Sequence, residues 1–172
     1  MGRYEDAVIF AATKHNGQKR KDGTPYIAHP MRVAAYLAEK GCSEDCQIAG
    51  LLHDVLEDTD ATEEEVALFG ENILKAVKLV SKNYSTDHES YLAGILQDEI
   101  ATMVKDADRI DNLKDAIKSD DLAFQERYLK DTYQYINYFS EELNDMYGKL
   151  LKEVQKNIPD APAPEKHKTK LL

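Results

Sequence analysis

The stretch His53-Asp54-Val55-Leu56-Glu57-Asp58-Thr59 governs the interpretation of this sequence. It sets a His-Asp doublet four residues before a Glu-Asp doublet. In an α-helix, residues four apart lie on one face, which predicts His53 above Glu57 and Asp54 above Asp58. Ionisable groups beside a buried stripe are costly to desolvate unless they are paired or coordinated, so a divalent metal ion is their natural partner. The stripe has helical spacing and comprises Ile48, Leu51, Leu52, Val55 and Leu56.

The rest of the chain predicts an all-α fold. Helical apolar spacing recurs from about Tyr4 to Val154, without the alternating runs or hairpin dipeptides typical of strands. We expect Ser43 to cap one helix that carries both doublets, and Thr62 to open a capping box. With 172 residues, the chain is long enough for one domain over residues 1–156. Residues 157–172 hold three of the five prolines and the stretch KHKTK, and are predicted to be a disordered tail.

The charge distribution restricts the partners. A net charge of −10 argues against a general nucleic-acid binder and against an anionic-membrane binder. Residues 57–65 are acidic, whereas residues 14–21, KHNGQKRK, form a basic island. This island favours a small anionic ligand, and a solvated loop is the alternative. No apolar run reaches the length of a membrane span and the N-terminus lacks a signal-peptide core, so we expect a cytoplasmic protein.

Two further residues complete a candidate metal site around His53 and Asp54. His29 precedes Pro30 at a predicted loop-to-helix junction, and Asp108 lies one helical turn after the apolar Val104. Two imidazoles and two carboxylates form a mixed nitrogen and oxygen donor set, suited to Mn, Fe, Co, Ni or Zn with open positions for water. Taken singly, His29 has the alternative of a capping or core histidine, and Asp108 that of an ion-pair partner for Lys105 or Arg109.

The two cysteines, Cys42 and Cys46, lie four residues apart just before and within the predicted helix of the doublets. Their spacing would suit half of a zinc site, but the sequence contains no second cysteine pair. A pair of reduced, structural thiols is the better interpretation, and it fits a cytosolic compartment.

Four segments of the sequence resemble the HD-domain metal-dependent phosphohydrolases, and within them the hydrolase domain of RelA/SpoT-type alarmone enzymes. The matching segments are GQKRKDGTPYIAHP, AGLLHDVLEDT, FG at 69–70 and VKDADRIDNL, in this order over about residues 5–118. The resemblance implies an HD-domain helical bundle in which one metal ion, commonly Mn²⁺, is bound by His29, His53, Asp54 and Asp108. Full-length relatives carry a synthetase domain and regulatory domains after this one. We therefore expect a small, single-domain alarmone hydrolase.

The reaction implied by the resemblance is removal of the 3′-pyrophosphate of ppGpp or pppGpp, which gives GDP or GTP and pyrophosphate. We interpret Glu57 and Asp58 as the groups that orient or deprotonate the attacking water and handle the proton of the leaving 3′-oxygen. The alternative is that they merely begin the acidic run. The resemblance also implies that Arg20 packs on the guanine base and that Lys21 lies at the same end of the pocket.

The nucleoside side of the site is less defined by the sequence. Asn112 lies one helical turn after Asp108, where it could hydrogen-bond the nucleoside; a solvated polar residue near a helix end is the alternative. Asp111, Lys114 and Asp115 depart from residues common in relatives, which leaves base and sugar selectivity open. The rival functions are the same metal site acting on ppApp, on the 2′-phosphate of NADPH or on a nucleoside monophosphate, and a non-catalytic nucleotide sensor.

Overall fold

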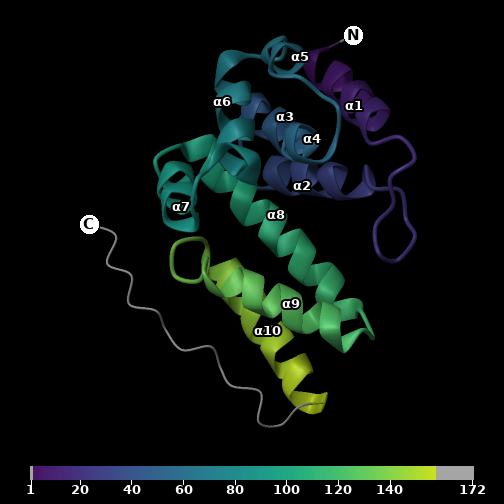
Figure 1. Cartoon of the computed structure of the whole chain (residues 1–172), viewed down its shortest axis with the longest axis vertical. Coiled ribbons are helices and arrows are strands. Elements are labelled where there is room, and N and C mark those ends of the chain that lie inside the picture. Colours follow the sequence, from purple (N-terminus) through teal and green to yellow (C-terminus); the bar gives the residue numbers. More distant parts are fainter. Residues whose placement is uncertain (1, 158–172) are drawn as a thin grey trace. The chain divides into compact units, whose positions relative to one another are not determined.

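A computed structural model describes residues 2–157 of the chain, and these residues are helical with no strand among them (Figure 1). The all-α prediction is therefore confirmed for this part of the chain. The molecule divides into two compact units, Met1–Asp108 and Arg109–Leu172. The predicted domain end at residue 156 stays a prediction, and the predicted disordered tail lies outside the described residues apart from Asn157, the last residue of a helix.

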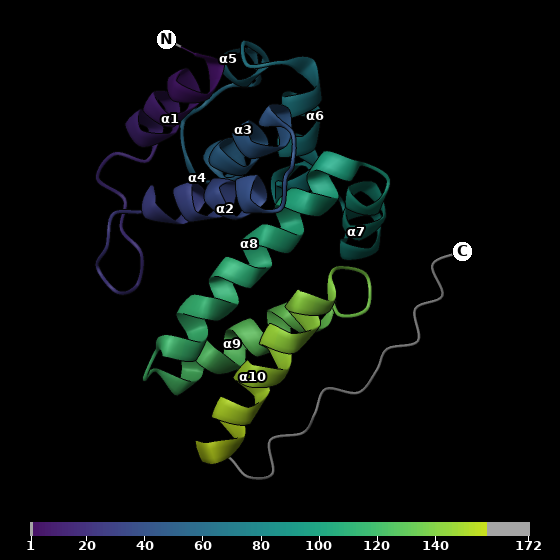
Figure 2. The ribbon, with the colours of Figure 1, turned by 180° about the vertical axis from the view of Figure 1, so that it is seen from behind.

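The first unit contains the four candidate metal ligands. Its helices are α1 (Arg3–Lys14), α2 (Ala28–Glu39), α3 (Glu44–Leu52), α4 (Val55–Asp58), α5 (Glu63–Ala67), α6 (Glu71–Val80), α7 (His88–Leu96) and the first half of α8 (Glu99–Lys118), with a 3-10 turn at Lys82–Tyr84. Both views show α2 and α3 side by side, with α1 and α6 also next to α3 (Figures 1 and 2). Helix α3 is therefore the centre of this unit.

The packing of α2 on α3 depends on Gly50. A Cβ atom at this position would lie 2.6 Å from Leu37 Cδ1 and 3.5 Å from the Ala34 backbone, closer to Leu37 than side-chain atoms normally approach. Glycine therefore lets the two helices approach one turn before His53. The apolar stripe predicted from the sequence is buried as expected, in Ile48, Leu51, Leu52, Val55 and Leu56.

Local signals in the sequence fix several helix ends. The Ser43 side chain accepts a hydrogen bond from the Cys46 N–H and caps α3. Thr62 and Glu65 form the expected capping box of α5. Gly41 has a φ of 74° directly after the end of α2, a conformation that glycine adopts at little cost.

The helix that carries the doublets is not continuous, and this part of the prediction is wrong. Helix α3 ends at Leu52, His53 and Asp54 lie in a turn, and α4 begins at Val55. The Asp58 N–H still donates to the Asp54 carbonyl at 2.9 Å, so that pair keeps the expected one-turn relation. Successive side chains on a regular helix diverge by about 100°, so the turn allows both doublet side chains to approach one point.

The second unit contains the end of α8, α9 (Leu122–Tyr133) and α10 (Glu141–Asn157). Helices α9 and α10 pack against each other, and the loop between them covers residues 134–140. None of the helices in residues 2–157 combines the length and the apolar character that crossing a membrane requires.

Candidate metal centre

Three parts of the first unit bring the predicted metal ligands together. His29 lies in the first turn of α2, His53 and Asp54 occupy the turn between α3 and α4, and Asp108 comes from α8. The side chains of His29, His53 and Asp108 are nearly inaccessible to solvent, and the Asp54 side chain is 19% exposed. Residues more than fifty positions apart in the sequence thus supply one buried cluster.

The ligand atoms of these residues lie close to one another. His53 Nε2 is 3.0 Å from Asp54 Oδ2 and 3.7 Å from Asp108 Oδ1. His29 Nε2 is 3.3 Å from Asp108 Oδ1 and 3.7 Å from Asp54 Oδ2. Two ligands held about 2.1 Å from one ion are about 3.0 Å apart when they meet it at a right angle, and farther apart at wider angles. The observed spacing therefore suits a shared cation.

The orientation of His53 gives independent support for a cation. Its Nδ1 lies 2.8 Å from the Gly50 carbonyl, which can only accept, so Nδ1 carries a proton. Nε2 is buried and makes no well-directed hydrogen bond, although two carboxylates lie within ion-pair distance. In the neutral imidazole its lone pair would face negative oxygens, which is unfavourable unless a proton or a metal ion lies between them.

The same cluster shifts the pKa values of its members in the metal-free protein. Burial disfavours the imidazolium of His53, but the Asp54 and Asp108 carboxylates outweigh burial and raise its pKa to about 10. Burial also opposes ionisation of Asp54, yet the neighbouring His53 and His29 hold the pKa of its carboxyl far below the usual range. In the metal-free protein a proton on His53 therefore balances the carboxylates, and metal binding has to displace it.

Lys105 is a further charged neighbour of the cluster. Its Nζ lies 3.2 Å from Asp108 Oδ2, one helical turn away on α8, and 5.6 Å from the ring centroid of Tyr91. The other carboxylate oxygen, Oδ1, faces the two histidines. The ion pair between Asp108 and Lys105, which was one alternative to a ligand role, thus coexists with placement in the cluster.

Asp58 lies at the edge of the cluster, in contact with Tyr26. The Tyr26 hydroxyl is 2.6 Å from Asp54 Oδ2 and 3.2 Å from Asp58 Oδ2. Burial and the nearby Asp54 charge raise the pKa of the Asp58 carboxyl above its usual range. Burial and Asp54 also raise the pKa of the Tyr26 hydroxyl, which therefore stays protonated and can donate.

Glu57 lies on the other side of α4. Its Oε2 accepts a hydrogen bond of 2.9 Å from the backbone N–H of Lys82, at the start of the 3-10 turn between α6 and α7. The carboxylate is therefore held by a backbone group of the segment between α6 and α7. Glu57 and Asp58 thus have different partners, a distinction that the sequence did not provide.

In the fold, two residues of the basic island, Lys14 and His15, contact other side chains of the protein. Lys14 pairs with Glu65 at 2.8 Å and with Asp60 at 3.2 Å, in the acidic run. His15 is buried, with Nδ1 2.8 Å from Gln18 Oε1. The contribution of these two residues to an exposed cationic surface is therefore smaller than the sequence suggested.

The two predicted base-side residues lie farther along the same loop. The Arg20 guanidinium lies 5.8 Å from the centroid of the Tyr26 ring, and Lys21 is exposed. The Tyr26 side chain thus lies near Arg20 through its ring and contacts a carboxylate of the cluster through its hydroxyl. Contact of either cation with a nucleotide stays a prediction.

Asn112 belongs to the second unit, where the Tyr128 hydroxyl lies 3.3 Å from Asn112 Oδ1. The Asn112 side chain is buried within α8, so the alternative of a solvated residue near a helix end is wrong. Its predicted contact with the nucleoside stays a prediction.

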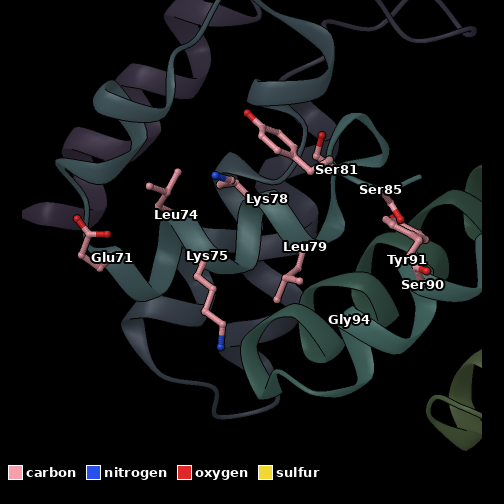
Figure 3. A pocket seen from close by; sticks show the side chains of 11 residues that line it. Glu71, Leu74, Lys75, Lys78, Leu79, Ser81, Ser85, Ser90, Tyr91 and Gly94 are labelled. Carbon is pink, nitrogen blue, oxygen red and sulfur yellow. The ribbon is translucent and has the colours of Figure 1, made fainter. Parts of the chain in front are cut away.

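A groove of about 600 Å³ lies between α6 and α7 and is lined by none of the predicted metal ligands (Figure 3). Leu74, Lys78 and Leu79 of α6 form one side, and Ser90, Tyr91 and Gly94 of α7 the other. Tyr91 is shared with the surroundings of the metal cluster through Lys105. The groove is thus a neighbour of the candidate centre and is not part of it.

Sequence reasoning missed Tyr26. The residue stands three positions before His29 in the segment Pro25–Pro30, so its proximity to that ligand was readable from the sequence. Its contacts with Asp54 and Asp58, about thirty positions later, were not readable from the sequence.

The two cysteines were expected to be reduced, and Cys42 and Cys46 are indeed free.

Comparison with known proteins agrees with this geometry. Residues 7–90 match the HD domain family. A solved structure of a metazoan ortholog of SpoT, described as hydrolysing ppGpp and having a role in starvation responses, aligns with 92% of this chain and 96% of its own at a TM-score of 0.68 and 28% identity. Residues 7–90 of this chain are thus similar to HD domains. Three of the four proposed ligands, His29, His53 and Asp54, lie within these residues.

Curated relatives of this chain are named as pyrophosphohydrolases or as GTP pyrophosphokinases. A guanosine-3′,5′-bis(diphosphate) 3′-pyrophosphohydrolase of Aquifex aeolicus is 46% identical over 117 residues, which cover 63% of this chain and 17% of the relative. A probable enzyme of the same name from Synechocystis is 42% identical over 121 residues, 63% of this chain and 16% of the relative. A GTP pyrophosphokinase of Myxococcus xanthus is 36% identical over 123 residues. The chain thus spans less than a fifth of the length of these relatives.

Proposed function

We propose that this chain is an HD-domain, metal-dependent hydrolase that removes the 3′-pyrophosphate of ppGpp or pppGpp, giving GDP or GTP and pyrophosphate. The observation that carries the proposal is the buried Nε2 of His53, which faces two carboxylates and has no well-directed hydrogen bond. Support for the substrate comes from the relatives named as ppGpp pyrophosphohydrolases and from the solved SpoT ortholog. The proposal includes a cytoplasmic enzyme that lowers the alarmone level.

One divalent metal ion, Mn²⁺ in our proposal, would be held by His29, His53, Asp54 and Asp108. When bound, it supplies Lewis acidity toward the phosphoryl oxygens, neutralises part of their charge and lowers the pKa of coordinated water. The mixed donor set is compatible with Mn²⁺, because imidazole and carboxylate are both ligands that this ion accepts. No thiolate takes part, as expected for a site that keeps positions open for water and substrate.

Glu57 and Asp58 are the proposed groups for the proton transfers of the reaction. Glu57 is fixed by the Lys82 N–H through one carboxylate oxygen, so its other oxygen can orient the attacking water or take up its proton. Asp58, whose pKa is raised by burial and by Asp54, has the environment of a group that keeps a proton longer than an exposed carboxyl does. It is therefore suited to protonate the leaving 3′-oxygen.

The substrate carries several negative charges, whereas the protein has a net charge of −10. Local cations are therefore needed, and Arg20 and Lys21 of the loop before α2 are the proposed source. The guanidinium plane of Arg20 can stack on a purine base, a contact that the ammonium of lysine does not reproduce. Asn112 is proposed to bond the nucleoside.

The test is release of pyrophosphate and phosphate by the purified protein with Mn²⁺, from ppGpp, ppApp, NADPH and nucleoside monophosphates in parallel. We expect pyrophosphate from ppGpp, abolished by Asp54→Ala through loss of the metal. Glu57→Gln is expected to reduce kcat about 10²- to 10⁴-fold, because proton transfer by a positioned side chain contributes about that much. Glu64→Gln is the matched control, since it removes the same charge from an exposed residue of the acidic run.

Other outcomes would revise the proposal in distinct ways. Turnover of ppApp, NADPH or monophosphates alone would keep the metal centre and reject the substrate. Nucleotide binding without turnover of any compound would indicate a sensor. Equal activity of the wild type and Glu57→Gln would reject the proposed part of Glu57.

A further inference from the structure

The short helix α4 is fixed at both ends by residues of one loop. Helix α4 has four residues, too few to be stable without tertiary contacts. At its start, Asp54 Oδ2 accepts from the Tyr26 hydroxyl; at its end, the Asp58 carbonyl accepts from Gln18 Nε2 at 2.7 Å. Gln18 and Tyr26 are joined by a hydrogen bond of 3.0 Å from the Tyr26 N–H to the Gln18 carbonyl.

The Tyr26 ring is itself held in place by aromatic neighbours. Its centroid lies 4.7 Å from that of His15, at an interplanar angle of 30°, and 6.1 Å from that of His29, nearly perpendicular. His15 is in turn bonded to Gln18. The hydroxyl therefore approaches the carboxylates from a fixed direction, which is the requirement for a group that orients a metal ligand.

The hydroxyl has one proton for two carboxylates. The distance of 2.6 Å to Asp54 against 3.2 Å to Asp58 identifies Asp54 as the main acceptor. Oδ2 of Asp54 is also the oxygen that lies 3.0 Å and 3.7 Å from the two histidine Nε2 atoms. Tyr26 thus donates to the carboxylate oxygen that faces the candidate metal position.

We propose that Tyr26 is a positioning residue of the metal centre: its hydroxyl orients the Asp54 carboxylate as a ligand and keeps Asp58 in register with it. The part of this inference that concerns turnover rests on the proposed function. The part that concerns metal binding does not, because Mn²⁺ affinity is measured without any nucleotide.

The experiment compares Tyr26→Phe with the wild type in two assays. Phenylalanine keeps the ring contacts and removes only the hydroxyl. Mn²⁺ affinity is measured by titration with detection of the free ion by electron paramagnetic resonance, and kcat and KM for ppGpp are measured at saturating Mn²⁺. We expect about 10- to 100-fold weaker Mn²⁺ binding, the usual cost of removing a partner of a metal ligand, and a lower kcat with KM changed less than about twofold.

Two further variants separate positioning from general loosening. Tyr4→Phe removes a hydroxyl from α1, outside the site, and should leave both assays unchanged. Thr59→Val removes a hydroxyl that bonds the Val55 carbonyl and the Ala61 N–H at the end of α4, and Mn²⁺ affinity should stay within about threefold of the wild type. Unchanged Mn²⁺ affinity in Tyr26→Phe, or equal weakening in Thr59→Val, would overturn the proposal. Normal Mn²⁺ effects without turnover of ppGpp would instead point to a wrong substrate.

Discussion

The buried cluster around His53 and the loop that carries Arg20 differ in how they are held. The cluster draws its atoms from α2, α8 and the turn between α3 and α4, and three of its four side chains are nearly inaccessible. In the loop, the Arg20 N–H donates to the Thr24 carbonyl at 2.8 Å, and the guanidinium lies 5.8 Å from the centroid of the Tyr26 ring. Packing therefore constrains the proposed metal ligands, while the proposed contacts with an anionic ligand depend on an exposed segment.

The largest effect is expected from breaking the cluster. His53→Gln removes a proposed ligand while keeping a polar side chain of moderate size. We expect loss of Mn²⁺ binding and at least a 10³-fold lower turnover, since even the loss of a partner of a ligand costs about 10- to 100-fold. Circular dichroism would verify the fold. Retention of stoichiometric Mn²⁺ binding would show that His53 is not a ligand.

A smaller effect is expected from the loop. Arg20→Ala should raise KM for ppGpp about tenfold with kcat changed less than about threefold, because the residue binds substrate and transition state alike. The increase should shrink at high salt, where exposed charges are screened. Lys152→Ala, on the exposed side of α10, is a charge-matched control. A large fall in kcat with constant KM would place Arg20 in the chemical step.

The helix contact beneath the cluster offers an indirect way to disturb it. Gly50→Ala would place a Cβ 2.6 Å from Leu37 Cδ1 and push α3 away from α2. Overpacking of this kind costs about 1–3 kcal/mol, which lowers the unfolding midpoint by a few °C. Since Gly50 also accepts from His53, weaker Mn²⁺ binding should accompany the change. Thermal melts with and without Mn²⁺ would measure both, and a gain in stability would contradict the prediction.

The expected effect of narrowest scope is a pH dependence of stability that concerns the metal-free protein alone. The pKa of His53 is raised from 6.5 to about 10 in the folded state, so the imidazolium contributes stability that is present below pH 6.5 and is lost as pH rises through 10. Melts in chelator should therefore show a midpoint that falls as pH rises over this interval. His53→Gln should remove this slope. Mn²⁺ should bind more tightly as pH rises, since it displaces the proton.

Much of the molecule was predictable from the sequence because the signals are local. The apolar stripe of α3, the Ser43 cap and the capping box at Thr62 depend on residues a few positions apart. The break in the helix at His53 was not predictable, because the local apolar spacing is that of a regular helix. Tyr26, which contacts Asp54 in the turn, and Gln18, which contacts the Asp58 carbonyl at the end of α4, lie far away in the sequence.

By itself, the sequence determined a candidate donor set of two histidines and two aspartates, with a Glu-Asp doublet beside them and cations before α2. The tertiary structure decided which of these groups act together. It committed Lys14 and His15 to other partners, gave Glu57 and Asp58 different environments and placed the Tyr26 hydroxyl on Asp54. The physical reason is that donor chemistry belongs to single side chains, whereas pairing depends on distances that only the packing of α2, α3 and α8 sets.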